Sequence, residues 1–182
     1  MDEHIELLDA AGKRTGKACL KSEAHKKGYF HASVHIWFYT QKAEILLQKR
    51  QCNKETFPNL WDVSVAGHIS FGEDPLTAAK REISEEIGLE IKPEQLTSLG
   101  TNTHKHLHTN HFTDYELHHI YCCLLQTPIQ DLIVQEEEVA EVKLLNIDQF
   151  ISELANPKTK GLYVPHGDPY YKKVINEIKK QI

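Results

Sequence analysis

Three glutamates lie close together in the stretch GHISFGEDPLTAAKREISEEIGL, which runs from residue 67 to residue 89. In a helix, a rotation of 100° per residue places Glu82, Glu85 and Glu86 on one face. Like charges spaced four residues apart repel one another, at a cost of roughly a few tenths of a kcal/mol per pair. A hard divalent cation such as Mg²⁺ takes oxygen ligands and would relieve this repulsion. The three glutamates are therefore candidate metal ligands, and a solvated acidic helix face is the alternative.

The residues around the glutamates support a helix. Asp74 is a suitable N-cap before Pro75, and Gly88 is a suitable C-terminal stop. A separate apolar stripe that could anchor the helix to a sheet is formed by Leu76, Ile83 and Ile87. On the helical wheel, neither Lys80 nor Arg81 falls among the three carboxylates.

The whole stretch resembles the signature of the Nudix hydrolases, which specifies glycine, glutamate, Arg-Glu and Glu-Glu at fixed spacings. The nine matching positions over 23 residues are Gly67, Glu73, Arg81, Glu82, Ile83, Glu85, Glu86, Gly88 and Leu89. A match of this length is much more specific than a short glycine motif. The resemblance implies a loop–helix–loop that binds Mg²⁺ or Mn²⁺ through Glu82, Glu85, Glu86 and the Gly67 carbonyl. It also implies that Glu73 and Arg81 brace the loop and the helix.

Most of the chain is also similar to the isopentenyl diphosphate isomerase branch of this family. The similar segments are LLDAAGKRTG, KSEAHKKGYFHASVHIW, LLQKRQCNKETFPNLWDVSVAGH and TDYELHHIY. The isomerases build a metal site apart from the helix, and its residues match His25, His31, His68, Asp114 and Glu116. Basic residues that hold the isomerase substrate's diphosphate match Lys21, Arg50 and Lys54. Taken singly, these side chains could equally be ordinary strand histidines and solvated surface cations.

Two departures from the isomerases favour hydrolysis. Where the isomerases carry a catalytic cysteine, this chain has Ala66, and a methyl group cannot exchange a proton with carbon. The isomerases also have a degraded helix signature, whereas the signature here is intact. We expect hydrolysis of a phosphoanhydride bond in a nucleoside di- or triphosphate or in an isoprenyl diphosphate. Isopentenyl diphosphate isomerisation and a non-catalytic, ligand-sensing Nudix domain are the alternatives.

Hydrolysis needs a general base, and several glutamates qualify. Glu85 and Glu116 are candidates, with Glu86 as a further catalytic residue. Glu136, Glu137 and Glu138 are also candidates, although the run QEEEV is more typical of a solvated loop. Four aromatic residues could contact the rest of the substrate or belong to the core or an edge, namely Phe57, Trp61, Phe71 and Tyr163. A strand would align His104, His106 and His108 on one face, which favours an exposed or cleft-lining face over a ligand cluster.

The elements that position these residues are those of one α/β domain. The 182 residues include 40% hydrophobic and 26% charged side chains, which is typical of a soluble domain with a single core. Predicted strands cover residues 5–9, 31–39, 44–49, 103–113, 117–126 and 139–145. Predicted helices cover residues 21–27, 75–87, 147–155 and 169–181. Because strands and helices do not alternate regularly, we expect a Nudix-type α/β/α sandwich with a mixed central sheet. Residues 1–182 would form one Nudix domain, with residues 1–30 as an isomerase-like N-terminal extension.

Composition also limits the partners and the compartment. A formal net charge of −5 argues against general nucleic-acid binding, so we expect a small-molecule diphosphate as partner. We expect no membrane association, because no apolar run approaches membrane-spanning length. Without a signal-like apolar segment or a C-x-x-C pair, the expected location is the cytoplasm. A homodimer is left open.

Overall fold

The computed structural model describes residues 2–109 and 111–182, which contain nine strands and four α-helices. The strands are β1 (His4–Leu8), β2 (Arg14–Leu20), β3 (His31–Tyr39), β4 (Glu44–Arg50), β5 (Trp61–Asp62), β6 (Val65–His68), β7 (Thr97–Thr109), β8 (Phe112–Leu124) and β9 (Val139–Asn146). The helices are α1 (Lys21–Lys27), α2 (Pro75–Ile87), α3 (Ile147–Ala155) and α4 (Asp168–Lys179). Short 3-10 helices cover Pro93–Gln95, Ile129–Asp131 and Lys160–Leu162. Among the described residues, every helix is too short or too polar to cross a membrane.

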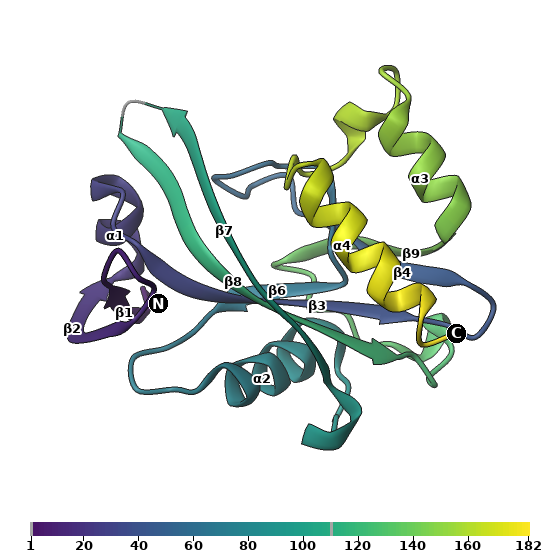
Figure 1. Cartoon of the computed structure of the whole chain (residues 1–182), viewed down its shortest axis with the longest axis horizontal. Helices are drawn as coiled ribbons and strands as arrows, with labels where there is room; N and C mark the ends of the chain where they lie inside the picture. The colour runs from purple at the N-terminus through teal and green to yellow at the C-terminus, as the bar shows by residue number, and fades with distance from the viewer. Residues whose placement is uncertain (1, 110) are drawn as a thin grey trace.

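The nine strands join one mixed, curled sheet with β3 at its centre (Figure 1). Strand β3 pairs antiparallel with β1, β4 and β6, and parallel with β8. Strand β7 pairs antiparallel with β8, while β5 and β9 pair antiparallel with β4. The mixed sheet predicted from the sequence is therefore confirmed.

Alternation along β3 directs its side chains into two hydrophobic layers. Val34, Ile36 and Phe38 pack in a buried cluster with residues of α2, whereas Trp37 and Tyr39 pack in a second cluster with residues of α3 and α4. Figure 1 shows α2 on one side of the sheet and α3 and α4 on the other. The α/β/α sandwich is thus the arrangement that buries both faces of the central strand.

The sheet face that carries Trp37 is polar along the first half of β3. His31, Ser33 and His35 precede Trp37 at every second position, so their side chains lie on the same face as Trp37. Strand β8 repeats the pattern with Asp114, Glu116 and His118, and the parallel register pairs His31 with Glu116 and Ser33 with His118. Because side chains of one parity share a face, the polar residues of both strands form one continuous floor.

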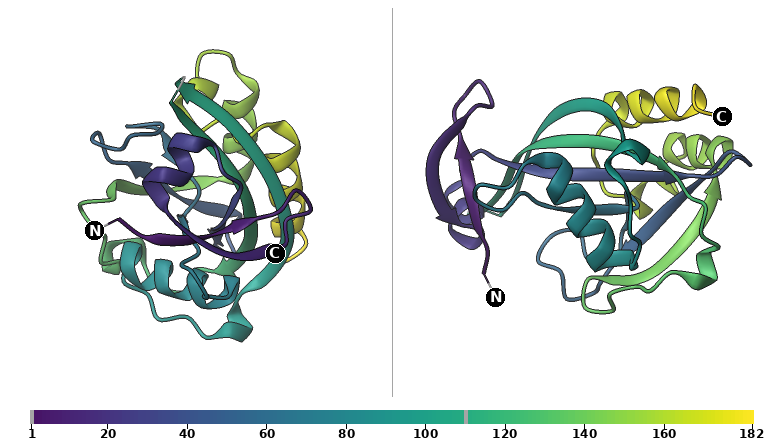
Figure 2. Two further views of the ribbon diagram at one scale, coloured as in Figure 1. Left: turned by 90° about the vertical axis from the view of Figure 1, so that its left-hand side faces the viewer. Right: turned by 90° about the horizontal axis from the view of Figure 1, so that it is seen from below.

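Two predicted boundaries in the sheet were wrong. Strands expected at 103–113 and 117–126 are instead β7 and β8, and β8 continues through residues 113–117. The segment TDYEL belongs to β8, and its alternation places Asp114 and Glu116 on the polar floor. The segment AAGKRTG, residues 10–16, reads from the sequence as a glycine turn, but its last three residues begin β2, which pairs with β1. The β1–β2 hairpin and α1 lie together at one end of the molecule, away from the C-terminus (Figure 2).

Candidate active site

Helix α2 begins and ends where the sequence predicts. The Asp74 side chain accepts hydrogen bonds from the backbone of Leu76 and Thr77 at 3.0 and 3.1 Å. At the other end, Gly88 has a φ of 69°, and its N–H donates to the Ser84 carbonyl. A Cβ on Gly88 would lie 2.7 Å from the Ile133 Cβ, so glycine also allows the loop before β9 to pack against the helix end. This loop is held there by a backbone hydrogen bond from Gln135 to the Glu86 carbonyl.

The three glutamates of α2 lie in different environments. Glu82 and Glu86 are buried, whereas the Glu85 side chain is 52% exposed. Glu86 Oε2 accepts hydrogen bonds from Gln48 Nε2 at 3.1 Å and from the Ala66 N–H at 3.3 Å. Burial raises the pKa of Glu82 to about 7 and that of Glu86 to about 8, and the charge of Glu82 adds to the second shift. Two buried carboxylates whose charged forms are disfavoured suit a divalent cation, which would stabilise the ionised forms.

Arg81 reaches the carboxylates that the helical wheel separated from it. Its Nη1 lies 2.8 Å from Glu82 Oε1 and 3.0 Å from Glu85 Oε2. Arg81 and Glu85 are an i,i+4 pair, which helix geometry brings together, whereas the contact with the adjacent Glu82 depends on the reach of the arginine side chain. Arg81 also donates to both Glu73 oxygens, at 3.1 and 3.0 Å, and to the His68 carbonyl at 3.0 Å. These contacts tie the loop after β6 to α2, which is the bracing arrangement expected for Glu73 and Arg81.

One cleft of about 550 Å³ contains the glutamates together with the three predicted substrate cations, Lys21, Arg50 and Lys54. Burial lowers the pKa of Lys54 to about 8, with the charges of Arg50 and Lys21 acting in the same direction. Sequence spacing alone does not bring these residues together, since Lys21 begins α1, Arg50 ends β4 and Lys54 lies in the following loop.

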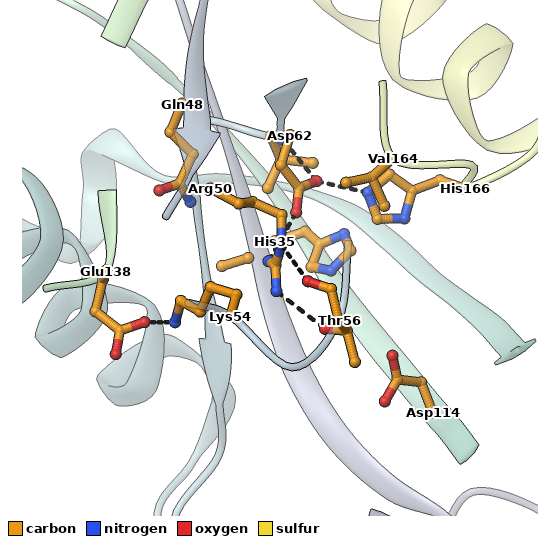
Figure 3. Close-up of polar contacts among 12 residues, drawn as sticks. His35, Gln48, Arg50, Lys54, Thr56, Asp62, Asp114, Glu138, Val164 and His166 are labelled. Carbon is orange, nitrogen blue, oxygen red and sulfur yellow. Dashed lines mark hydrogen bonds and ion pairs between the residues drawn. The ribbon is translucent and has the colours of Figure 1, made fainter. Parts of the chain in front are cut away.

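Two of these cations already contact protein groups (Figure 3). Arg50 donates to the Thr56 carbonyl and hydroxyl, both at 3.0 Å, and its Nη1 lies 3.2 Å from Asp62 Oδ2. Lys54 forms an ion pair with Glu138. Arg50 therefore holds the loop after β4 in place, and Lys54 has a carboxylate partner that a bound phosphate would have to compete with.

The residues of the predicted second metal site also meet in this region. One ligand atom from each of His25, His31, His68 and Glu116 lies within 4.8 Å of all the others. Asp114 stands behind this group, with its carboxylate oxygens 2.9 Å from His25 Nδ1 and 2.6 Å from His108 Nε2. The contact with His108 is a hydrogen bond, whereas the contact with His25 is at an ion-pair distance. Burial lowers the pKa of His68 to about 3, so the ring is neutral, as metal binding requires.

Glu116 is held by three histidines. Burial favours its neutral form, but the nearby His118, His31 and His68, whose Nε2 atoms lie 3.4, 3.7 and 3.5 Å from its carboxylate oxygens, lower the pKa of Glu116 well below its ordinary value. A general base works best with a pKa near the working pH, so this environment favours a ligand role over a base role.

The other predicted residues divide between the cleft and its surroundings. Glu137 and Glu138 line the cleft, whereas Glu136 offers its backbone carbonyl to Gln51. Phe57 lines the cleft and packs against His106 and His108. Trp61 and Tyr163 pack with the core cluster under α3 and α4, and Phe71 is 48% exposed.

Several cleft residues were missed by the sequence reasoning, namely His35, His118 and His166. His35 and His118 could have been predicted from the sequence. Each lies on the same strand face as a predicted metal ligand, His35 with His31 on β3 and His118 with Glu116 on β8. His104 lines the cleft from β7, in agreement with the expected cleft-lining face. His166 had no such signal, since it lies in the loop before α4 and the fold alone brings it to the cleft.

Comparisons with known proteins agree with this geometry. Residues 29–165 match the family model described as the NUDIX domain. Nudix hydrolase 3 of Arabidopsis thaliana is 32% identical over 189 residues, covering 99% of this chain but only 24% of that protein, so this chain spans about a quarter of that relative. An isopentenyl-diphosphate Delta-isomerase of Aliivibrio fischeri (strain MJ11) is 30% identical over 183 residues, covering 98% of each chain. A Deinococcus radiodurans crystal structure has a TM-score of 0.63 at 18% identity, covering 84% of this chain and 89% of that chain.

Proposed function

The chain belongs to the Nudix family, and we propose that it is a divalent-metal-dependent hydrolase that cleaves a phosphoanhydride bond in a small-molecule diphosphate or triphosphate. The observation that carries this proposal is the pair of buried carboxylates, Glu82 and Glu86, facing a cleft that also contains Lys21 and Lys54. Buried acidic groups with raised pKa values beside basic groups are the combination that binds a metal ion and a phosphate together.

Each part of the cleft would have a separate task. Glu82, Glu85, Glu86 and the Gly67 carbonyl would hold Mg²⁺ or Mn²⁺, which neutralises charge on phosphoryl oxygens and makes a bound water more acidic. Lys54 and Lys21 would grip the non-reacting phosphate. Arg50 would fix the loop that carries Lys54 and would bind phosphate through the N–H groups that Thr56 and Asp62 leave free.

The general base would be Glu85 or Glu137. Glu85 is exposed and lies beside the buried pair, and Glu137 lines the cleft. Glu138 is already paired with Lys54, and the low pKa of Glu116 makes that carboxylate a weak proton acceptor. Comparing the pH–rate profiles of Glu85→Gln and Glu137→Gln would separate the two, because loss of the base removes the acidic limb of the profile.

One buried hydroxyl in the cleft favours a polar organic group on the substrate. Ser33 Oγ lines the cleft and has no hydrogen-bond partner among the described residues. A hydrocarbon chain packed against it would leave this group unsatisfied, at roughly 1–3 kcal/mol. We therefore favour a nucleoside di- or triphosphate, or another polar diphosphate, over an isoprenyl diphosphate.

Isopentenyl diphosphate isomerisation is the second candidate. It is supported by the cluster of His25, His31, His68 and Glu116, and by the similarity to the Aliivibrio fischeri isomerase. It is opposed by Ala66, whose methyl group lies on the cleft wall where a proton-exchanging thiol would be needed.

The proposal is tested by measuring phosphate and pyrophosphate release over a panel of nucleotides and isoprenyl diphosphates, with Mg²⁺ and with EDTA. We expect release from at least one substrate that requires Mg²⁺ and is lost in Glu86→Gln. The matched control is Glu94→Gln, which removes an exposed carboxylate on a surface 3-10 helix. Release that is equal with EDTA, or equal in Glu86→Gln, would rule out the proposed metal site.

We also propose that the protein works in the cytoplasm on a small molecule and does not bind nucleic acid. All four cysteines are free thiols, which suits a reducing compartment. The net charge of −5 supports a partner smaller than a nucleic acid, with cations supplied locally in the cleft.

A further inference from the structure

A second group of histidines lines the same cleft. One ligand atom from each of His35, His118 and His166 lies within 4.8 Å of the other two. The residues come from β3, from β8 and from the loop before α4. The His35 ring lies with its centroid 3.9 Å from that of His118 and 5.0 Å from that of His166. We propose that these three histidines bind a transition-metal ion of intermediate softness, such as Zn²⁺ or Co²⁺.

The contacts behind the rings are those of metal ligands. One nitrogen of each ring lies next to a polar group outside the cluster, called here its outer partner. His35 Nδ1 lies 2.7 Å from Tyr170 Oη, and His166 Nε2 lies 2.7 Å from Asp62 Oδ1. His118 Nε2 lies 3.4 Å from Glu116 Oε2. Histidine ligands in proteins almost always have such a partner on the nitrogen that does not bind the metal. Figure 3 shows that Asp62 also contacts Arg50, so the outer partner of His166 is itself fixed.

The inner nitrogens have unfilled bonding capacity. His118 Nδ1 and His166 Nδ1 are buried and have no hydrogen-bond partner among the described residues. A buried polar atom without a partner is uncommon and calls for an explanation. Two such atoms on neighbouring rings, with a third histidine beside them, are explained together by one bound cation. A hydrogen-bonded water is the competing explanation and would give a different result in the test below.

The chemistry of the three rings suits this class of metal. Neutral imidazole is the form of histidine that binds a metal ion. Three imidazoles leave the fourth position of a tetrahedral Zn²⁺ or Co²⁺ open. Hard Mg²⁺ prefers oxygen ligands, so this group would select a different ion from the glutamates of α2.

Glu116 lies between this group and the predicted second metal site of His25, His31 and His68. One of its oxygens, Oε1, lies 3.5 Å from His68 Nε2, while Oε2 faces His118. The two groups nevertheless use different histidines, so substitutions can separate them. This separation makes a quantitative metal-binding experiment possible.

The experiment uses the full chain with His25→Ala and His68→Ala, which remove two histidines of the predicted site. Excess Mg²⁺ is kept present to occupy the carboxylates of α2. Co²⁺ is then titrated, and binding is followed by equilibrium dialysis and by the visible absorption of tetrahedral Co²⁺. We expect one equivalent of Co²⁺ with a tetrahedral spectrum.

A matched pair of additional substitutions tests the ligands. His118→Gln removes a proposed ligand. His119→Gln changes the next residue on β8, whose side chain lies on the opposite face of the sheet. We expect His118→Gln to weaken Co²⁺ binding by more than the roughly 10- to 100-fold that loss of an outer partner costs. His119→Gln should leave the affinity and the spectrum unchanged. If His118→Gln does not fold, His166→Gln gives the same test from a loop position.

Two results would overturn the proposal. One is a folded background protein, judged by circular dichroism, that takes up no Co²⁺ under these conditions. The other is equal Co²⁺ affinity in the folded His118→Gln or His166→Gln protein and in His119→Gln. Either outcome would assign the cluster to hydrogen bonding and trapped water.

Discussion

The carboxylate of Glu82 fills the space that a side chain at Gly67 would need: a Cβ built on Gly67 would lie 2.0 Å from Glu82 Cδ. The glycine therefore lets α2 lie close to β6 and brings a buried carboxylate against the backbone of the strand. The Nudix resemblance assigns metal binding to the carbonyl of the same glycine. The close approach of these two residues thus has a structural and a chemical consequence, and both can be measured.

Gly67→Ala should displace Glu82 and weaken Mg²⁺ binding, because the new methyl group cannot share the space of the carboxylate. Overpacking of this kind typically costs about 1–3 kcal/mol of stability. Calorimetric Mg²⁺ titration and thermal unfolding measure the two effects. Gly161→Ala is the control, since a Cβ on Gly161 meets no atom within 4 Å. Mg²⁺ affinity equal to that of the wild type in Gly67→Ala would show that the geometry of Glu82 does not matter for metal binding.

Glu86→Gln and Glu85→Gln should each lower Mg²⁺-dependent turnover by orders of magnitude. Their effects on stability should differ, because Glu86 is buried and Glu85 is exposed. Without metal, Glu86→Gln should raise the midpoint of thermal unfolding at pH 8, since it removes a carboxylate whose charged form is disfavoured by burial. Glu85→Gln should leave the midpoint nearly unchanged, because its pair with Arg81 is at the surface. Near-wild-type turnover in both variants would contradict the assignment of metal ligands.

The metal-free protein should lose stability as the pH rises from about 4.5 to about 8. The pKa values of Glu82 and Glu86 are raised by burial to about 7 and about 8. A group with a raised folded-state pKa contributes stability below its unfolded pKa, and this contribution disappears as the pH passes the folded value. Unfolding midpoints in EDTA at intervals of pH measure the decline. Mg²⁺ should oppose it most strongly at the highest pH, where protons compete least. A stability that is constant over this range in EDTA would contradict the buried-carboxylate interpretation.

The value of kcat/KM should decline above about pH 8, because Lys54 loses its proton there. Burial lowers the pKa of Lys54 to about 8, so the side chain loses its positive charge as the pH rises through that value. Lys54→Arg should remove the decline, since arginine stays charged. Lys54→Ala should raise KM by roughly ten- to a hundredfold at pH 7, the equivalent of one charge-assisted hydrogen bond. A decline that persists unchanged in Lys54→Arg would assign it to another group.

The fold was predictable where one residue type dominated a segment. Alternating apolar residues in β3 and the caps of α2 indicated those elements directly, because burial and capping act locally. The boundary between β7 and β8 was not predictable in the same way. There the polar residues Asp114 and Glu116 face a cleft rather than solvent, and local polarity cannot distinguish the two.

Residues of the site could be predicted only where they fell within the Nudix signature or within a segment similar to the isomerases. The signature identified Glu82 and Glu86 but gave no sign that both are buried, since burial depends on β6 and the loop before β9. Arg81 was expected to brace the loop, yet its contact with the adjacent Glu82 depends on side-chain reach. His166 could not be predicted from its neighbours, because it meets Asp62 from a distance of 104 residues along the chain.

The most direct measurement of the proposed chemistry is isotope incorporation in H₂¹⁸O. The wild-type protein, Mg²⁺ and each phosphorylated compound of the panel are incubated together, and the products are identified by ³¹P NMR and mass spectrometry. Because hydrolysis breaks a P–O bond with water, we expect ¹⁸O in a released phosphate or pyrophosphate or in the remaining phosphorylated product. This incorporation should be absent in Glu86→Gln. Formation of dimethylallyl diphosphate from isopentenyl diphosphate, without ¹⁸O in any phosphorylated product of the panel, would contradict hydrolysis and identify an isomerase.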